Sequence, residues 1–180
     1  PKFGCINERR HQLHEVIRLS GMNLIINDTD HALLIKVASV PSARMQVYFI
    51  DNEEYFKRKA DTHDAEGNFF PDNDERALFF GRGVLEPVRK LGWVPDIIRC
   101  HGWMTAFVPL YVRHHFADDP HFENTKLVFS VYDQKPEALD KDLAKKLAME
   151  GFDKELFKGL AKPTTDDLVK FGMGLSDAVV

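Results

Sequence analysis

The chain has 180 residues, of which 44% are hydrophobic and 29% charged, and its formal net charge is −4. This length fits one domain over residues 1–180 with enough apolar content for a core, and the acidic balance argues against a nucleic-acid partner, which would require a basic face. No apolar run approaches the roughly 20 residues of a membrane span, and the two cysteines, Cys5 and Cys100, are too few for a disulfide framework. We therefore expect a reduced, cytoplasmic protein with no membrane partner.

The first third of the chain predicts one short helix and several antiparallel strands. Asn7 is placed to cap a helix that continues to Gln12. Three segments are rich in β-branched and aromatic residues, and a turn signal, Asn-Asp-Thr-Asp at residues 27–30, separates the first two. The strands are expected at residues 23–26, 32–40 and 45–50.

A long polar segment over residues 51–72 leads into a strong helix. The segment is too long for an ordinary connection, so we expect a functional or mobile loop. Asp72 or Asn73 is placed to supply the cap oxygen of the helix, and Pro87 predicts a kink or break. Gly81-x-Gly83 is interpreted as a point of close packing. The residues at helical spacing that we expect to face the core are Ala77, Phe80, Val84, Val88 and Leu91.

The second half of the chain alternates strands and helices, which favours an α/β fold with a parallel sheet. A short buried strand is expected at residues 96–100, and a helix with a kink at Pro109 follows Trp103 and ends near His115. A second buried strand is expected at residues 126–131. Further helices are expected at residues 139–149, 153–160 and 167–175, and a last strand begins near residue 176.

His101, Gly102 and Trp103 follow the strand at residues 96–100 directly, so they lie at its carboxyl end. Ligands of open α/β sheets bind at that edge, and Tyr132 follows the next strand in the same way. A histidine, a glycine and a tryptophan there suit contacts with a sugar or nucleotide. The alternative is a structural one, in which His101 is a hydrogen-bonded residue at the helix entry and Trp103 belongs to the core.

Other candidate sites have simpler interpretations. Asp51, Asp72 and Asp74 could act as acids or bases, but helix capping and solvation explain each of them. Cys100 and His101 are neighbours on a strand and point to opposite faces, which argues against a nucleophile pair. The sequence has no phosphate-binding glycine loop and no nucleophile elbow.

The eight histidines invite a metal site. No cysteine partner and no known zinc spacing accompanies them, so solvated surface histidines are the interpretation we favour. The histidines considered are His11 with His14, and His114 and His115 with His121.

Several collinear segments together resemble the glycogen and starch synthase family, retaining glucosyltransferases that use a nucleotide-activated glucose. These segments are VYFIDNEEYF at residues 47–56, PDNDERALFFGRGVLE at 71–86, KLGWVPDIIRCHGWMTAFVPLYVR at 90–113 and VFSVYD at 128–133. Residues 167–180 resemble the helix and strand that close the family's first domain. The resemblance covers most of the chain.

The resemblance implies a GT-B-type enzyme of two Rossmann-like domains with the active site in the cleft between them. This chain would be most of the first, acceptor-side domain, with a locally antiparallel addition from residues 24–50. The family's opening strand and glycine-rich donor loop, and its second domain, would lie outside the chain, so a partner domain or chain would carry the donor site. The implied reaction adds glucose from ADP-glucose to an α-1,4-glucan, with no metal and no other cofactor.

The chain departs from the family pattern at the positions that hold the reacting sugar. The family usually reads His-Asp-Trp-His where this chain has His101-Gly102-Trp103-Met104, and Thr-Val-His-Asn where it has Ser130-Val131-Tyr132-Asp133. Gly102 stands where the family has an aspartate, and Met104 and Tyr132 stand where it has histidines. The resemblance assigns catalytic positions to His101, Gly102 and Tyr132, and substrate contacts to Trp103, Met104 and Asp133. It also implies that Asp72, Asn73 and Arg76 contact the acceptor or shape the cleft rim.

Two other functions stay open. The substitutions at Gly102 and Tyr132 favour a non-catalytic glucan-binding or regulatory module derived from the enzyme, whereas the intact DNDER segment at residues 72–76 favours the enzyme. A metal-dependent hydrolase built on the histidines is the third alternative.

Overall fold

The computed structural model describes residues 1–180. They form two compact units, one of residues 1–25 and 29–70 and the other of residues 26–28 and 71–180. The prediction of one domain over residues 1–180 stays a prediction. No helix in either unit has the length and apolar character required to cross a membrane.

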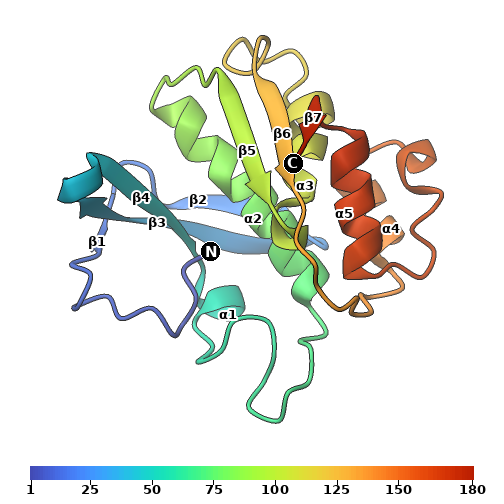
Figure 1. Ribbon diagram of the computed structural model, residues 1–180, viewed down its shortest axis with the longest axis horizontal. Coiled ribbons are helices and arrows are strands. Elements are labelled where there is room, and N and C mark those ends of the chain that lie inside the picture. Colours follow the sequence, from blue (N-terminus) through green and yellow to red (C-terminus); the bar gives the residue numbers. More distant parts are fainter. The chain divides into compact units, whose positions relative to one another are not determined.

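An antiparallel sheet forms the first unit and confirms the three predicted strands (Figure 1). Strand β3 (Thr29–Val40) lies next to β1 (His14–Glu15) and β2 (Met22–Ile26), and it also pairs with β4 (Met45–Asp51). Asn27 and Asp28 connect β2 to β3 with φ of 50° and 61°. Two consecutive positive φ values are typical of the tight turns that join antiparallel strands.

Two predictions for the first unit were wrong. Residues 8–12 form turns and no helix, although the Asn7 side chain accepts a hydrogen bond from the Arg10 N–H at 2.9 Å. The segment after β4 contains a helix that was not predicted, α1 (Glu53–Phe56), capped by the side chain of Asn52. Four residues are too few to show a helical period, so the sequence carries little signal for α1 apart from its cap.

Helix α2 (Asn73–Lys90) opens the second unit where it was predicted and continues through Pro87 without a break. Asp72 occupies the N-cap position, but its side chain does not accept a capping hydrogen bond. Close packing at Gly81 is confirmed, because a Cβ there would lie 3.1 Å from the Phe107 Cβ.

The predicted core face of α2 is only partly correct. Ala77 is buried, but Phe80, Val84, Val88 and Leu91 are half-buried. The apolar residues that α2 buries most completely are Leu78, Phe79 and Leu85. Ala77, Leu78 and Phe79 are consecutive and all buried, so the buried residues of α2 span a wider arc than a single stripe of spacing predicts.

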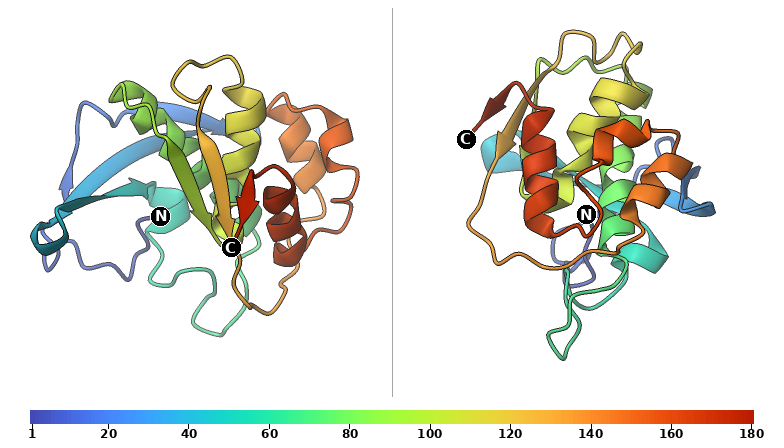
Figure 2. Two further views of the ribbon diagram at one scale, coloured as in Figure 1. Left: turned by 45° about the horizontal axis from the view of Figure 1, so that its top comes forward. Right: turned by 90° about the vertical axis from the view of Figure 1, so that its right-hand side faces the viewer.

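A parallel sheet of three strands lies in the second unit, in the order β5 (Ile97–His101), β6 (Lys126–Ser130) and β7 (Ala178–Val179) (Figure 2). Between β5 and β6 the chain forms a 3₁₀ turn, η2 (Trp103–Thr105), the helix α3 (Phe107–Leu110) and a π-helical turn, η3 (Tyr111–His115). Between β6 and β7 lie α4 (Leu143–Met149), the 3₁₀ turn η4 (Lys154–Phe157) and α5 (Thr165–Gly174). The helical path continues through Pro109, as it does through Pro87.

Helices cover one face of this sheet. Cys100, Leu127 and Phe129 point into the core, whereas Ile97 is 62% exposed. The predicted strand at residues 96–100 is therefore present, but one of its two faces is exposed and not buried. β5 is an edge strand, and Ile97, Arg99 and His101 on it are exposed.

The last helices start and end differently from the prediction. Helix α4 starts at Leu143 instead of residue 139, and the segment expected as a helix at 153–160 contains only the turn η4. Helix α5 starts at Thr165, two residues early, because Thr164 and Asp167 form a capping box. The α/β class with an antiparallel addition is confirmed.

Candidate functional site at the carboxyl edge of the parallel sheet

His101 and Tyr132 come together at the carboxyl ends of β5 and β6. The strands pair in register, with His101 opposite Ser130, so Tyr132 lies two residues beyond the paired end. The His101 Nδ1 and the Tyr132 hydroxyl oxygen are 2.6 Å apart, and both residues are exposed. The sequence predicted that these two residues share one edge, and the structure also shows that they bond to each other.

Gly102 has a backbone conformation that requires glycine. Its φ is 68° and its ψ −179°, a combination adopted almost only by glycine. Its N–H donates to the Ser130 carbonyl at 3.1 Å, and its own carbonyl accepts from the Thr105 hydroxyl at 2.9 Å. A Cβ at Gly102 would still have room, with Tyr132 as its nearest neighbour at 3.8 Å. The conformation of the backbone, and not a lack of space, therefore excludes a side chain here.

Trp103 is half-buried. Its exposure is therefore intermediate between that of a core residue and that of a freely accessible ligand contact. It lines a shallow pocket of about 30 Å³, the room of a single water molecule, together with Tyr132 and the start of α5. Met104 is half-buried and Asp133 exposed. The remaining pocket residues, which sequence reasoning missed, are Val131, Gln134, Thr165, Asp166 and Val169. The three on α5 lie more than 30 positions from Tyr132, and no motif signals their position.

Cys100 faces away from this edge. Its side chain is buried, and burial raises the pKa of the thiol to about 12, which a hydrogen bond with Thr105 offsets only in part. A thiol with this pKa is not a nucleophile at neutral pH. The opposite orientation of Cys100 and His101 agrees with the sequence prediction.

Asp72, Asn73 and Arg76 lie at the start of α2. Asn73 and Arg76 are fully buried, and the Arg76 guanidinium donates to the Asn73 side-chain oxygen at 2.5 Å, while Asp72 is half-buried. No hydrogen bond or ion pair in the structure joins these three residues to His101 or Tyr132. Their assignment to substrate contacts stays a prediction.

Two of the candidate acid or base carboxylates are held in ion pairs. Asp51 bonds to Lys36 at 2.8 Å in the first unit. Asp74 is fully buried and bonds to Lys146 at 2.7 Å, and the same ammonium also contacts Glu75 and Asp140. Burial raises the pKa of Asp74. Burial alone would lower the pKa of Lys146, but the three carboxylates raise it.

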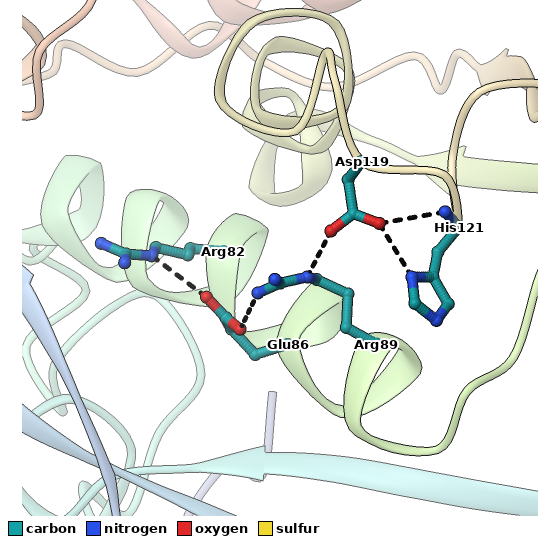
Figure 3. Close-up of polar contacts among 5 residues, drawn as sticks. All are labelled: Arg82, Glu86, Arg89, Asp119 and His121. Carbon is teal, nitrogen blue, oxygen red and sulfur yellow. Dashed lines mark hydrogen bonds and ion pairs between the residues drawn. The ribbon is translucent and has the colours of Figure 1, made fainter.

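The histidines do not gather into a metal site, since no group of three or more potential metal ligands occurs. His121 instead belongs to a polar network at the opposite, amino edge of the sheet (Figure 3). Asp119 accepts from His121 at 2.8 Å and from Arg89 at 2.6 Å, and Glu86 connects Arg89 to Arg82. Burial alone would raise the pKa of Asp119, but the bonds from His121 and Arg89 hold it below its ordinary value. This network ties α2 to the loop before β6.

Comparisons with known proteins identify the family of the chain. The whole chain, residues 1–180, matches the family described as the starch synthase catalytic domain. The glycogen synthase of Chlorobium limicola is 41% identical over 135 residues, which are 73% of this chain and 27% of that protein. The glycogen synthase of Chlorobaculum parvum is 35% identical over 181 residues, covering 99% of this chain and 36% of that protein.

A solved structure has the same fold. The catalytic domain of starch synthase IV from Arabidopsis thaliana, bound to ADP and acarbose, superimposes with a TM-score of 0.72 at 22% identity, over 99% of this chain and 36% of that one. The chain thus has the fold of the corresponding part of that catalytic domain. The chain belongs to the glycogen and starch synthase family. It spans roughly a quarter to a third of the length of the relatives that it matches.

Proposed function

We propose that this chain forms the acceptor-side part of a glucosyltransferase that transfers glucose from ADP-glucose to an α-1,4-glucan. The observation that carries the proposal is the hydrogen bond between His101 and Tyr132 at the carboxyl edge of the parallel sheet. The chain that forms this sheet matches the starch synthase catalytic domain over its whole length. The relatives are glycogen synthases, and the Arabidopsis structure holds ADP together with acarbose. The donor nucleotide would be bound by a partner domain, and no metal or other cofactor is required.

The edge offers hydrogen-bonding groups and an aromatic surface to a sugar. Tyr132 occupies the Nδ1 side of the His101 ring, so the Nε2 side is left to contact a sugar hydroxyl. Trp103, Met104 and Asp133 extend this edge. Because Asn73 and Arg76 are fully buried, we assign them the role of shaping the cleft rim and leave direct contact to Asp72.

Glycosyl transfer passes through an oxocarbenium-like transition state, which fixed charges and dipoles at the site stabilise. Gly102 supplies no carboxylate there, and Tyr132 offers a hydroxyl group where the family has an imidazole ring. The polar groups left near the reacting sugar are the His101 ring, the Tyr132 hydroxyl and the Asp133 carboxylate.

A second function has its own support: a glucan-binding module without transfer activity. The conformation of Gly102 belongs almost only to glycine, so the backbone as well as the side chain differs from what an aspartate at this position requires.

The first experiment is a calorimetric and NMR titration of the 180-residue chain with maltoheptaose. Both functions predict saturable binding that perturbs the Trp103 and His101 ring signals, and His101→Ala should weaken it. Absence of binding up to millimolar glucan would contradict both functions.

A chimera separates the two functions. This chain would replace the matching third of the Chlorobaculum parvum glycogen synthase, and incorporation of glucose from ADP-glucose would be measured. Turnover that falls sharply in His101→Ala supports transfer. Glucan binding without turnover, in a chimera whose thermal unfolding is cooperative, supports the binding module.

A further inference from the structure

A second concave surface lies between α4 and the segment after it. The pocket has a volume of about 570 Å³. Volumes of roughly 300–1,000 Å³ are typical of sites for small organic ligands. None of its lining residues belongs to the candidate site described above. They are Ala144, Lys145, Ala148, Met149, Lys154, Phe157, Lys158 and Ala161.

The sequence of α4 explains why the pocket is there. Leu143 and Leu147, four positions apart, are buried against the core, while Ala144 and Ala148, about 100° further around the helix, line the pocket. Alanine side chains are too short to fill the space up to η4, where the buried ring of Phe157 lies. The wall of the pocket is therefore apolar, and Met149, 47% exposed, extends it toward solvent.

The charged residues of the lining have one sign. Lys145, Lys154 and Lys158 are exposed, and no carboxylate lines the pocket. Lys158 pairs with Glu155 at 2.5 Å, whereas Lys145 and Lys154 form no ion pair. An apolar wall with unpaired ammonium groups complements a ligand that has an apolar body and an anionic head.

We propose that this pocket binds a small amphiphilic anion, with a carboxylate or phosphate head held by Lys145 and Lys154 and an alkyl or aryl body against Ala148, Met149 and Phe157. This site is independent of the proposed glucosyl transfer and stands whether or not the chain binds glucan.

The test compares ligands that differ in one feature. Octanoate and octanamide have the same body, and only octanoate is charged. Acetate has the head without the body, and octyl phosphate changes the head. Each is titrated into the 180-residue chain below its micelle concentration, with affinity from calorimetry and the site mapped by NMR signals of Met149 and Ala148. We expect octanoate to bind about three- to tenfold more tightly than octanamide, because exposed ion pairs with two ammonium groups each contribute little in water.

Two variants and a control assign the effect to the pocket. Lys145→Gln with Lys154→Gln should remove the advantage of octanoate over octanamide, and Ala148→Leu should weaken both ligands by filling the pocket. The control, Lys135→Gln with Lys141→Gln, changes two exposed lysines that do not line the pocket and should leave every affinity unchanged.

Several results would overturn the proposal. They are equal affinity for octanoate and octanamide, equal affinity for octanoate and acetate, no binding at millimolar ligand, or perturbed signals away from α4 and η4. Tighter binding of octyl phosphate than of octanoate would identify the head as a phosphate, and the reverse would identify it as a carboxylate.

Discussion

The imidazole of His101 and the phenol of Tyr132 share a 2.6 Å hydrogen bond across the ends of two adjacent parallel strands. The bond fixes which ring nitrogen of His101 is turned toward Tyr132 and which is turned away. Within the proposed site, this orientation decides which atoms of the His101 imidazole can contact a ligand.

Tyr132→Phe removes the hydroxyl and should release the His101 ring. We expect the ¹⁵N signals of the His101 ring to move toward those of a free, tautomer-averaged imidazole. The free energy of unfolding should change by less than about 0.5 kcal/mol, because Tyr132 is half exposed. Tyr48→Phe, at a tyrosine 39% exposed in the other unit, is the control and should leave those signals unchanged. Unmoved His101 signals in Tyr132→Phe would show that the bond does not persist in solution.

Gly102→Ala places a side chain on a backbone with φ of 68° and ψ of −179°. We expect a loss of about 1–3 kcal/mol in the free energy of unfolding from this conformation. Gly159 has open space around it and no positive φ, so Gly159→Ala is the matched control and should cost nothing. The measurement is chemical denaturation of both variants. Equal stability of the two would mean that residue 102 can change its conformation freely.

Gly172→Ala tests the packing of α5 against the strand end. A Cβ at Gly172 would lie 2.6 Å from the Phe129 ring and 3.1 Å from the Ala106 carbonyl oxygen. Such an overlap requires the buried Phe129 ring or the Ala106 backbone to shift, and it should cost about 1–3 kcal/mol. Gly174, in the same helix, has no atom within 4 Å of such a Cβ, so Gly174→Ala should be neutral or stabilising. Thermal unfolding of the pair measures the difference, and a neutral Gly172→Ala would contradict this packing.

Lys146→Met removes the ammonium that holds three carboxylates. Asp74 would be left fully buried with no opposite charge, which should cost about 3–5 kcal/mol at neutral pH. Lys145→Met changes the next residue, which is exposed, and should stay within about 0.5 kcal/mol of the parent. A loss below about 1 kcal/mol in Lys146→Met would show that water reaches Asp74.

The same ion pairs predict how stability depends on pH. The folded state raises the pKa of Lys146 above its ordinary 10.5, so its contribution is complete below that pH and is lost as the pH rises through the folded value. Burial raises the pKa of Asp74, so in Lys146→Met the deficit should shrink as the pH falls and Asp74 takes up a proton. Denaturation curves of parent and variant between pH 4 and 11 measure the effect of Asp74 and the onset of the loss at Lys146. A deficit that does not change with pH would exclude the carboxylates as its cause.

The sequence by itself determined the order of most strands and helices and the edge where the candidate site lies. The spacing of apolar residues along strands and helices encodes these features locally. The segments around His101 and Tyr132 also contain enough residues in common with the family to identify the class of protein. A strand that leads directly into a helical segment also places His101, Gly102 and Trp103 at the carboxyl end of that strand.

Only the tertiary structure decided which side chains meet. Three features bring together residues from different elements. They are the bond between His101 and Tyr132, the contacts of Lys146 with Asp74, Glu75 and Asp140, and the pocket lined by Ala144 and Ala148. Exposure of Ile97 likewise depends on which face of the sheet the helices cover. Local spacing cannot encode these relations, because they arise from the packing of elements that lie far apart in the chain.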